Sequence, residues 1–444
     1  MTASKQAPTL HIGLAGLGNV GAGVCKNLDR NRELLRERTG TDLVVKKIAV
    51  RDPSRKRDVE VPAGLITTRL LDLVEDEGID IIVELIGGTV EAYEFVKAAL
   101  QAGKPVVTGN KALLAEHGKE LIELAEKMNV PLYCEAAVAG GIPIIKVVKE
   151  ALIGNKIEAI YGIINGTSNF ILSQMAEGMA FDDALAEATR LGYAEADPTL
   201  DVNGWDAGHK AIILAWLSYG FWIKPADVSV KGIENISQVD VEFADYLDYD
   251  IKLLGVVRQD DDGHIEVRVE PSLIPQDHIL ASVGGVFNAV AVHGDVVGET
   301  LFYGSGAGQD ATSSAVISDL ADAVENITNG VGASGFIPHG DFGCAKPIGE
   351  TVSQYYLRLT VDDTPGVLAK IARVLGDAGV GILSVIQPEM RDQQDGAPLV
   401  LTLHDSKLGT VEAALAEIGE LDCVRGQPVL MRVEPLAPGG VAGN

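Results

Sequence analysis

A glycine-rich turn near the N-terminus constrains the fold of this chain more than any other feature of the sequence. The segment Gly16-Leu17-Gly18-Asn19-Val20-Gly21 directly follows an apolar run and opens a helical pattern. At a helix start, free backbone N–H groups and the helix dipole favour a phosphate. The spacing therefore predicts a dinucleotide site with the pyrophosphate near Gly16, Gly18, Asn19, Val20 and Gly21, and the alternative is an ordinary turn between a strand and a helix.

The first 135 residues alternate between apolar runs and helical patterns, which is typical of a parallel sheet covered by helices. We expect strands at Leu10 to Leu14, Val44 to Val50, Ile79 to Ile86, Val106 to Thr108 and Leu132 to Cys134. Apolar residues recur at helical spacing near Val20 to Arg36, Glu91 to Ala102 and Leu113 to Met128. We predict an α/β fold that begins with a Rossmann-type doubly wound sheet over 1–135, whose ligands lie beyond the carboxyl ends of its strands.

The rest of the chain divides into regions of different composition. Residues 136–304 mix strands and helices, which indicates an α+β substrate domain, and we expect 305–328 to return to the first domain. Residues 329–352 are rich in Gly and Pro and are interpreted as a linker. Residues 353–434 show the order of a small ferredoxin-like βαββαβ sandwich. We expect the tail 435–444 to be disordered.

Charge and apolar patterning exclude some classes of partner. The chain has 63 Asp and Glu against 36 Lys and Arg, so most of its surface would repel nucleic acid. No signal peptide core and no long uncharged apolar run is present, which argues against a membrane partner. The four cysteines show neither paired nor metal-type spacing. These features together predict a cytoplasmic protein with reduced thiols.

The end of the second expected strand bears on cofactor choice. Arg51 follows Val50 where a site for NAD usually has an acidic residue, and it could meet a 2′-phosphate. NADP(H) is therefore favoured. Asp52 is counter-evidence, because its carboxylate could accept the ribose hydroxyls of NAD, and a solvated basic loop is a further interpretation.

Four charged residues are candidates for the chemistry. Lys111 lies at the carboxyl end of a sheet strand, on the side where the cofactor is expected. Asp206 and Lys210 share one face of a helix that continues as a strongly apolar stretch, so the lysine could act as an acid or base. Glu195 precedes that helix and could bind an ammonium group. A surface salt bridge is the simpler interpretation of the Asp206–Lys210 pair.

The segment from Glu135 to Pro143 offers one carboxylate and several backbone carbonyls in close succession. Oxygen ligands of this kind suit a hard cation. A plain turn between domains explains the residues equally well. No histidine spacing indicates a transition metal.

Ordered sequence blocks across nearly the whole chain resemble homoserine dehydrogenase of the long, monofunctional bacterial type. The blocks are Gly-Leu-Gly-Asn-Val-Gly at Gly16, Val-Thr-Gly-Asn-Lys-Ala around Lys111, Glu-Ala-Ala-Val-Ala-Gly-Gly-Ile-Pro at Glu135, Asn-Gly-Thr-Ser-Asn-Phe at Asn165, Gly-Tyr-Ala-Glu-Ala-Asp-Pro at Gly192, Asp-Ala-Gly-His-Lys at Asp206 and Tyr-Gly-Ser-Gly-Ala-Gly at Tyr303. The chain departs from the family at Gln309 to Ser313, where a proline is usual. The module from Tyr355 resembles an ACT domain, because Asp362 to Leu368 match its Asp-x-x-Pro-Gly-Val-Leu turn.

The resemblance implies reversible oxidation of L-homoserine to L-aspartate 4-semialdehyde, a step toward threonine, methionine and isoleucine. It implies that Lys210 donates the proton, that Lys111 contacts cofactor and substrate, and that Glu195 and Asp206 hold the substrate. Thr89 and Gly306 match positions that contact the cofactor. The resemblance also implies a sodium ion held by Glu135, Val138, Gly140 and Ile142.

For assembly and control, the resemblance implies at least a homodimer, formed through the 136–304 domain, and feedback by threonine at the ACT domain. An ACT domain that serves only structure or dimerisation is the alternative. Two other functions compete with the enzyme. One is a dehydrogenase of another amino-acid semialdehyde or of a hydroxy acid, and a substrate without an ammonium group would have no use for Glu195. The other is a sensor without catalytic activity that binds a dinucleotide and an amino acid.

Overall fold

The computed structural model describes residues 7–194, 197–220, 222–260, 262–332, 344–387 and 396–436. The chain divides into two compact units that are both discontinuous in sequence. The first contains 1–155, 212–225 and 302–341, and the second contains 156–211, 226–301 and 342–444. Within the described residues no helix is both long and apolar enough to span a membrane.

A six-stranded sheet in which all described pairings are parallel forms the centre of the first unit. Its spatial order is β3-β2-β1-β4-β5-β6, so the direction of the strand order reverses between β1 and β4. The strands are β1 (Thr9–Ala15), β2 (Asp42–Ala49), β3 (Ile66–Thr67), β4 (Ile81–Glu84), β5 (Val106–Thr108) and β6 (Leu132–Tyr133). This is the order of a Rossmann sheet, as the sequence predicts.

Helices cover both faces of this sheet, and each face has its own apolar core. Val24 of α1 and Leu320 of α12 pack on one face, whereas Phe95 of α4 and Leu121 of α5 pack on the other. The helices of the unit are α1 (Asn19–Arg30), α2 (Arg32–Thr39), α3 (Leu71–Glu75), α4 (Val90–Gln101), α5 (Lys111–Met128), α6 (Ile144–Lys146) and α12 (Gln309–Asn329). The single helix expected over Val20 to Arg36 is instead two helices, which meet at Asn31.

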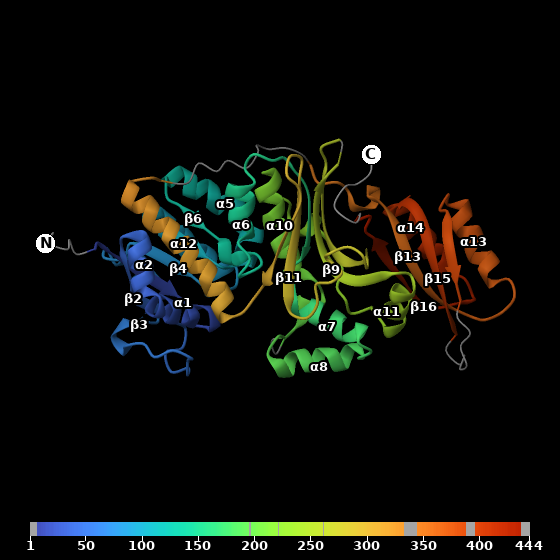
Figure 1. Cartoon of the computed structure of the whole chain (residues 1–444), viewed down its shortest axis with the longest axis horizontal. Helices are drawn as coiled ribbons and strands as arrows, with labels where there is room; N and C mark the ends of the chain where they lie inside the picture. Colours follow the sequence, from blue (N-terminus) through green and yellow to red (C-terminus); the bar gives the residue numbers. More distant parts are fainter. Residues whose placement is uncertain are drawn as a thin grey trace. The chain divides into compact units, whose positions relative to one another are not determined.

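Helix α12 lies far along the chain but packs against α1, as Figure 1 shows in orange beside blue. Asn27 of α1 donates to the Ser313 hydroxyl at 2.7 Å and to the Asp310 carboxylate at 3.1 Å. These buried and half-buried bonds fix the start of α12 beside the helix that follows the glycine-rich turn.

The second unit is built on one mixed sheet of ten strands. Its path is β12-β11-β7-β9-β10-β16-β13-β15-β14, and β8 pairs with β10 beside this path. The strands are β7 (Ile157–Ile163), β8 (Ser229–Val230), β9 (Tyr249–Gln259), β10 (Ile265–Pro275), β11 (Phe287–Gly294), β12 (Gly298–Ser305), β13 (Val352–Val361), β14 (Ile382–Ile386), β15 (Ala397–Lys407) and β16 (Val424–Val433). The helices are α7 (Gly166–Ala176), α8 (Phe181–Leu191), α9 (Thr199–Val202), α10 (Trp205–Tyr219), α11 (Gln238–Tyr246), α13 (Val367–Asp377) and α14 (Leu408–Gly419). Helix α10 begins in this unit and ends in the first.

The last six of these elements in chain order form the predicted βαββαβ module. Strands β13, β14, β15 and β16 carry helices α13 and α14, and Ile371 and Val411 of the two helices share a core with Leu357 and Leu401 of the strands. The predicted fold class, with a Rossmann sheet, an α+β region and a ferredoxin-like module, is thus confirmed. Residues 333–343 of the expected linker and 437–444 of the expected disordered tail lie outside the described residues.

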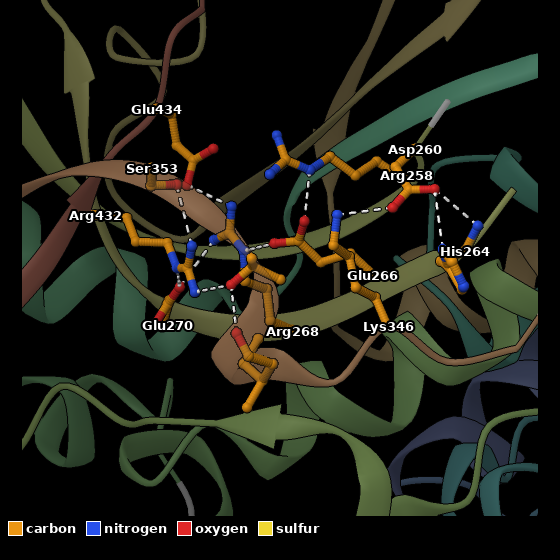
Figure 2. A network of polar contacts seen from close by, with 12 residues as sticks. Arg258, Asp260, His264, Glu266, Arg268, Glu270, Lys346, Ser353, Arg432 and Glu434 are labelled. Carbon is orange, nitrogen blue, oxygen red and sulfur yellow. Dashed lines mark hydrogen bonds and ion pairs between the residues drawn. The ribbon is translucent and has the colours of Figure 1, made fainter. Parts of the chain in front are cut away.

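A buried network of charged side chains joins the module to the rest of its unit (Figure 2). The Arg268 guanidinium on β10 contacts Glu266 at 2.6 Å, Glu270 at 3.0 Å and Glu434 beyond β16 at 2.7 Å. Arg432 of β16 reaches the same Glu270 carboxylate at 2.5 Å. Strands β10 and β16 are therefore joined by ion pairs as well as by their short parallel pairing.

A second charged contact links helix α11 to β13. The Asp240 carboxylate is fully buried and accepts two hydrogen bonds from the Arg358 guanidinium, at 2.6 and 3.0 Å. It also accepts from the Tyr356 hydroxyl at 3.0 Å and caps its own helix through Ser237. The sequence analysis did not predict α11, because its alternating polar and apolar residues give no clear helical face.

Candidate active site

The glycine-rich turn has the shape that a pyrophosphate site requires. Gly16 has φ of +97°, and a Cβ there would lie 2.5 Å from the Leu85 carbonyl oxygen. A Cβ on Gly21 would lie 2.2 Å from the Gly16 oxygen, whereas a Cβ on Gly18 would meet nothing within 4 Å. Gly16 and Gly21 are therefore required for the close packing of turn and helix, and Gly18 borders open space.

The start of α1 faces that space without a competing negative charge. Gly18 provides no side-chain cap, and the first turn of α1, which begins at Asn19 and Val20, contains no acidic residue. Backbone N–H groups at an uncapped helix start and the positive end of the helix dipole both favour a phosphate. These residues fit the pyrophosphate of a dinucleotide, although the Asn19 side chain accepts a hydrogen bond from Gln309 at 3.2 Å.

At the end of β2 the two candidate ribose-binding side chains have different environments. The Arg51 side chain is 91% exposed and pairs with Glu91 at 3.4 Å. The Asp52 carboxylate accepts the backbone N–H of Ser54 at 2.8 Å and its hydroxyl at 2.6 Å. These hydrogen bonds hold the pKa of Asp52 below its ordinary value. The arginine is thus an exposed group with a long ion pair to Glu91, whereas the aspartate accepts two short hydrogen bonds within its own turn.

A buried carboxylate that the sequence analysis missed organises the loops after β4 and β5. Glu84 is fully buried and accepts the Ile86 N–H at 2.9 Å and the Thr108 hydroxyl at 2.5 Å. Burial raises the pKa of this carboxyl, while those hydrogen bonds oppose the rise. The available signal was a single charged residue inside an apolar strand.

The same loops position Thr89 and Lys111. Asn110 caps α5 by accepting the Leu113 N–H at 3.1 Å, and its amide donates to the Gly88 carbonyl at 2.7 Å. Thr89, at the start of α4, and Lys111, at the start of α5, are therefore carried by two loops that are bonded to each other. Both residues lie at the carboxyl ends of neighbouring strands, where a doubly wound sheet binds its ligand.

In the second unit, Lys210 and Asp206 form a buried pair rather than a surface salt bridge. Lys210 is 8% exposed, and its Nζ atom lies 2.6 Å from Asp206 Oδ2 and 2.6 Å from the Ile164 carbonyl oxygen. An ammonium with these two acceptors is held in one direction. A buried lysine beside a carboxylate is a suitable proton donor or acceptor.

Asn165 and Asp201 extend this pair, and neither was predicted as a site residue. The Asn165 amide nitrogen donates to Asp206 Oδ2 at 2.9 Å and to Asp201 Oδ1 at 2.8 Å. Glu195 lies outside the described residues. Thr167 donates to the Tyr193 carbonyl at 2.8 Å and so ties the segment just before Glu195 to α7.

The turn that follows β6 contains the predicted cation ligands, and Glu135 is buried in it. The Glu135 carboxylate accepts the backbone N–H groups of Ile145 at 3.1 Å and Lys146 at 2.9 Å. Burial raises the pKa of this carboxyl to about 7. Its own N–H donates to Asp319 of α12 at 2.8 Å, and burial together with the Glu135 charge raises the pKa of Asp319 well above its ordinary value.

Backbone conformation in this turn is unusual at Ala139 and Gly140, which have φ of +54° and +44°. A Cβ on Gly140 would lie 2.5 Å from the Gly306 oxygen, and the Gly141 N–H donates to the Ser305 carbonyl at 2.9 Å. The turn and the segment around Gly306 are therefore in direct backbone contact within the first unit.

Three protein-family models match this chain, one after another along the sequence. The model described as the NAD binding domain of homoserine dehydrogenase matches residues 16–135, and the homoserine dehydrogenase model matches residues 143–321. The ACT domain model matches residues 355–420.

Individual relatives agree over nearly the full length. The chain is 45% identical to a homoserine dehydrogenase of Pseudomonas aeruginosa and 43% identical to one of Neisseria gonorrhoeae, covering 96% of this chain and 99% of each relative. A crystal structure of a homoserine dehydrogenase from Thiobacillus denitrificans is 44% identical, with a TM-score of 0.89 over 96% of this chain and 98% of that one. A hyperthermophilic archaeal homoserine dehydrogenase in complex with NADPH is 30% identical, with a TM-score of 0.60 over 72% of this chain and 98% of that one.

Proposed function

Because this chain belongs to the homoserine dehydrogenase family, we propose that its buried Lys210 exchanges the proton of the family's reaction while Asp206 and Glu195 hold the substrate. The enzyme oxidises L-homoserine reversibly to L-aspartate 4-semialdehyde with a nicotinamide dinucleotide. The observation that carries the proposal is the Lys210 ammonium held between Asp206 and the Ile164 carbonyl.

The proton and the hydride leave homoserine from the two ends of one C–O bond. In the oxidation direction the neutral Lys210 amine accepts the hydroxyl proton as the carbonyl forms. A nicotinamide dinucleotide held by the first unit would supply the acceptor for the hydride of the terminal carbon. In the reverse direction the Lys210 ammonium returns the proton to the carbonyl oxygen, and its charge stabilises the developing alkoxide.

Glu195 and Asp206 would bind the substrate by charge. Homoserine carries an ammonium group, which a carboxylate at Glu195 is suited to bind. Asp206 has a second role, because its bond to Lys210 fixes where the proton is delivered.

The cofactor contacts are assigned on the first unit. The pyrophosphate would lie over Gly16, Gly18, Asn19, Val20 and Gly21, and Thr89 and Lys111 would meet the nicotinamide end. Gly306 is assigned as a further contact, supported by its approach to Gly140.

We assign NADP(H) as the preferred dinucleotide, and NAD(H) remains the alternative. The support is the exposed Arg51 guanidinium beside the engaged Asp52. A 2′-phosphate can form a bidentate pair with such an arginine.

A sodium ion is proposed in the turn formed by Glu135, Val138, Gly140 and Ile142. Because the Glu135 carboxylate already accepts two backbone N–H groups, we assign the ligand role at this position to its main-chain oxygen. The positive φ angles at 139 and 140 support a curled turn whose carbonyls can converge on a hard cation.

Regulation and assembly are assigned to the second unit. We propose that threonine binds the ACT module and lowers activity, and that the enzyme is at least a homodimer. Strand β14 ends the ten-stranded sheet and exposes Leu383 and Val385, which supports pairing of the modules. The four free cysteines support a reducing compartment, which we take to be the cytoplasm.

The proposal is tested by replacing Lys210 with alanine and following NADPH absorbance with homoserine and NADP⁺. Turnover should fall by about 10³-fold, because the proton acceptor is lost, while NADPH titration should give an unchanged dissociation constant. Lys224→Ala, at an exposed lysine, is the matched control and should retain turnover. Near-normal turnover in Lys210→Ala would overturn the assignment.

A further inference from the structure

Asn165 connects more groups of the catalytic cluster than its place at a helix start requires. It directly precedes α7, is 3% exposed, and uses both ends of its amide. Its oxygen accepts the Ser168 N–H at 2.7 Å, which is the usual bond of a helix N-cap. Its nitrogen contacts the carboxylates of Asp201 and Asp206, which an N-cap does not need.

The chemistry of the neighbours fixes the orientation of this amide. Rotating it by half a turn would place the amide oxygen against two carboxylate oxygens and the NH₂ group against the Ser168 N–H. The Asp201 backbone is also held, because the Ser168 hydroxyl donates to its carbonyl at 2.8 Å. The amide therefore has one orientation, with its two hydrogens divided between two negative charges.

The amide of Asn165 and the ammonium of Lys210 donate to the same oxygen atom of Asp206. Asp206 Oδ2 accepts from Asn165 at 2.9 Å and from Lys210 Nζ at 2.6 Å. Lys210 donates in addition to the carbonyl of Ile164, the residue before Asn165. Two consecutive residues thus contact both members of the Lys210–Asp206 pair.

We infer that Asn165 is a positioning residue for proton transfer, whose amide holds Asp206 in place and moderates its attraction for the Lys210 proton. This inference rests on the proposed function of Lys210. A neutral double donor lets two carboxylates lie near each other without sharing a proton. It also takes part of the hydrogen-bonding capacity of Asp206 Oδ2, so that Lys210 can release its proton to and from the substrate.

The charged groups around the lysine come from two described helices. Asp206 lies on α10 with Lys210, and Asp201 lies on α9. His209 lies beside Lys210 on α10 and packs its ring 5.8 Å from that of Trp205. The Asn165 variants keep all three side chains but remove the hydrogen bonds that Asn165 donates to Asp201 and Asp206.

Two substitutions distinguish the hydrogen bonds that Asn165 donates to the two carboxylates from its role as the N-cap of α7. Asn165→Ser and Asn165→Asp both keep a good N-cap acceptor for the Ser168 N–H. Serine removes the two donors without adding charge, whereas aspartate replaces them with a third carboxylate. Asn169→Ser is the matched control, because Asn169 is buried in the same helix but donates to backbone carbonyls at 283, 285 and 287.

The measurement is the pH dependence of single-turnover hydride transfer from homoserine to NADP⁺, with thermal unfolding of each variant recorded alongside. Loss of the donors should strengthen the hold of Asp206 on the Lys210 proton. We expect the acid limb of the profile to move to higher pH, by about 0.5 to 1 unit in Asn165→Ser and by more in Asn165→Asp. The plateau rate should fall about tenfold, and Asn169→Ser should lower the melting temperature without moving the limb.

An acid limb that stays at the wild-type pH in both Asn165 variants would overturn the inference and leave Asn165 as a helix cap. Lys210→Ala, measured in the same series, separates this result from failure of the proposed function. If Lys210→Ala has lost its rate while the Asn165 variants keep the wild-type limb, only the inference about Asn165 falls. If Lys210→Ala transfers hydride at a near-normal rate, the assignment of Lys210 falls, and the inference falls with it.

Discussion

Lys210 and Arg268 are both buried cations of the second unit, but the protein surrounds them differently. Arg268 is completely buried and contacts three carboxylates, those of Glu266, Glu270 and Glu434. Lys210 is nearly as buried, and the described contacts give it one carboxylate, Asp206, and one carbonyl. Among the described contacts, Arg268 therefore has three carboxylate partners, whereas Lys210 has a carboxylate and a neutral carbonyl oxygen.

The two residue types also differ in whether they can lose a proton. A guanidinium stays charged throughout the accessible pH range, so Arg268 can only neutralise the carboxylates that meet at β10 and β16. A buried lysine can lose its proton. Burial alone therefore does not mark a cation that can exchange a proton, because the type of the buried residue decides whether it can release one.

The largest effect on stability is expected when Arg268, the cation with three carboxylate partners, is removed. Arg268→Met leaves buried carboxylates without their shared partner and should lower the free energy of unfolding by about 3–5 kcal/mol. Urea unfolding measures this value. The control is Arg373→Met, at an exposed arginine whose one carboxylate partner lies 3.6 Å away, and it should change stability by less than about 1 kcal/mol. Equal effects of the two substitutions would contradict a structural role for Arg268.

Acid should weaken the same network at a defined pH. Burial by itself raises the pKa of Glu266, but Arg268 and Arg258 more than offset this and lower it to about 2, below the ordinary value of 4.5. The unfolded chain therefore takes up this proton first, and stability is lost as pH falls from 4.5 toward about 2. Glu266→Gln should be less stable than wild type at neutral pH, and the gap should close through this window. A gap that does not change with pH would show that Glu266 is not ionised in the fold.

Removing the charge of Asp206 beside Lys210 should affect rate more than stability. Asp206→Asn keeps the side-chain shape but weakens the hold on the ammonium, and kcat/KM for homoserine should fall about 10²-fold. The urea midpoint should stay near that of wild type. The exposed Asp277→Asn provides the control substitution, and a rate equal to that control would remove Asp206 from the site.

Arg51 is a third cation, and it lies on the surface. Its substitution should change activity the least. Its side chain is 91% exposed, so Arg51→Ala should leave stability unchanged. The KM for NADP⁺ should rise about tenfold while the KM for NAD⁺ stays constant, because only NADP⁺ carries the 2′-phosphate. Arg55→Ala serves as the neighbouring control. Equal changes for both cofactors would refute the choice of NADP(H).

Local sequence patterns predicted those parts of the fold that depend on residues close together in the sequence. The glycine-rich turn gave the start of α1, and the alternation of apolar runs gave the parallel sheet. The βαββαβ order of the C-terminal module also followed from the pattern. Asn165 was visible only as part of a motif, because its contacts with Asp201 and Asp206 span 36 and 41 residues.

Contacts between distant segments could not be predicted in this way. Arg268 and Glu434 are 166 residues apart, and no periodicity in either segment indicates that they meet. The bond between Glu135 and Asp319 spans 184 residues. Such pairs depend on tertiary packing, which also decides whether a charged residue in an apolar strand, such as Glu84, is a loop anchor or a surface group.

The most direct test replaces Lys210 by an arginine, which stays protonated as Arg268 does. Lys210→Arg keeps a positive charge beside Asp206 but removes a group that can release a proton, and its single-turnover hydride transfer from homoserine is compared with that of wild type. The account predicts a folded variant that still binds NADPH and transfers hydride about 10³-fold more slowly. Hydride transfer within about tenfold of wild type would show that positive charge alone suffices, and would contradict proton exchange by Lys210.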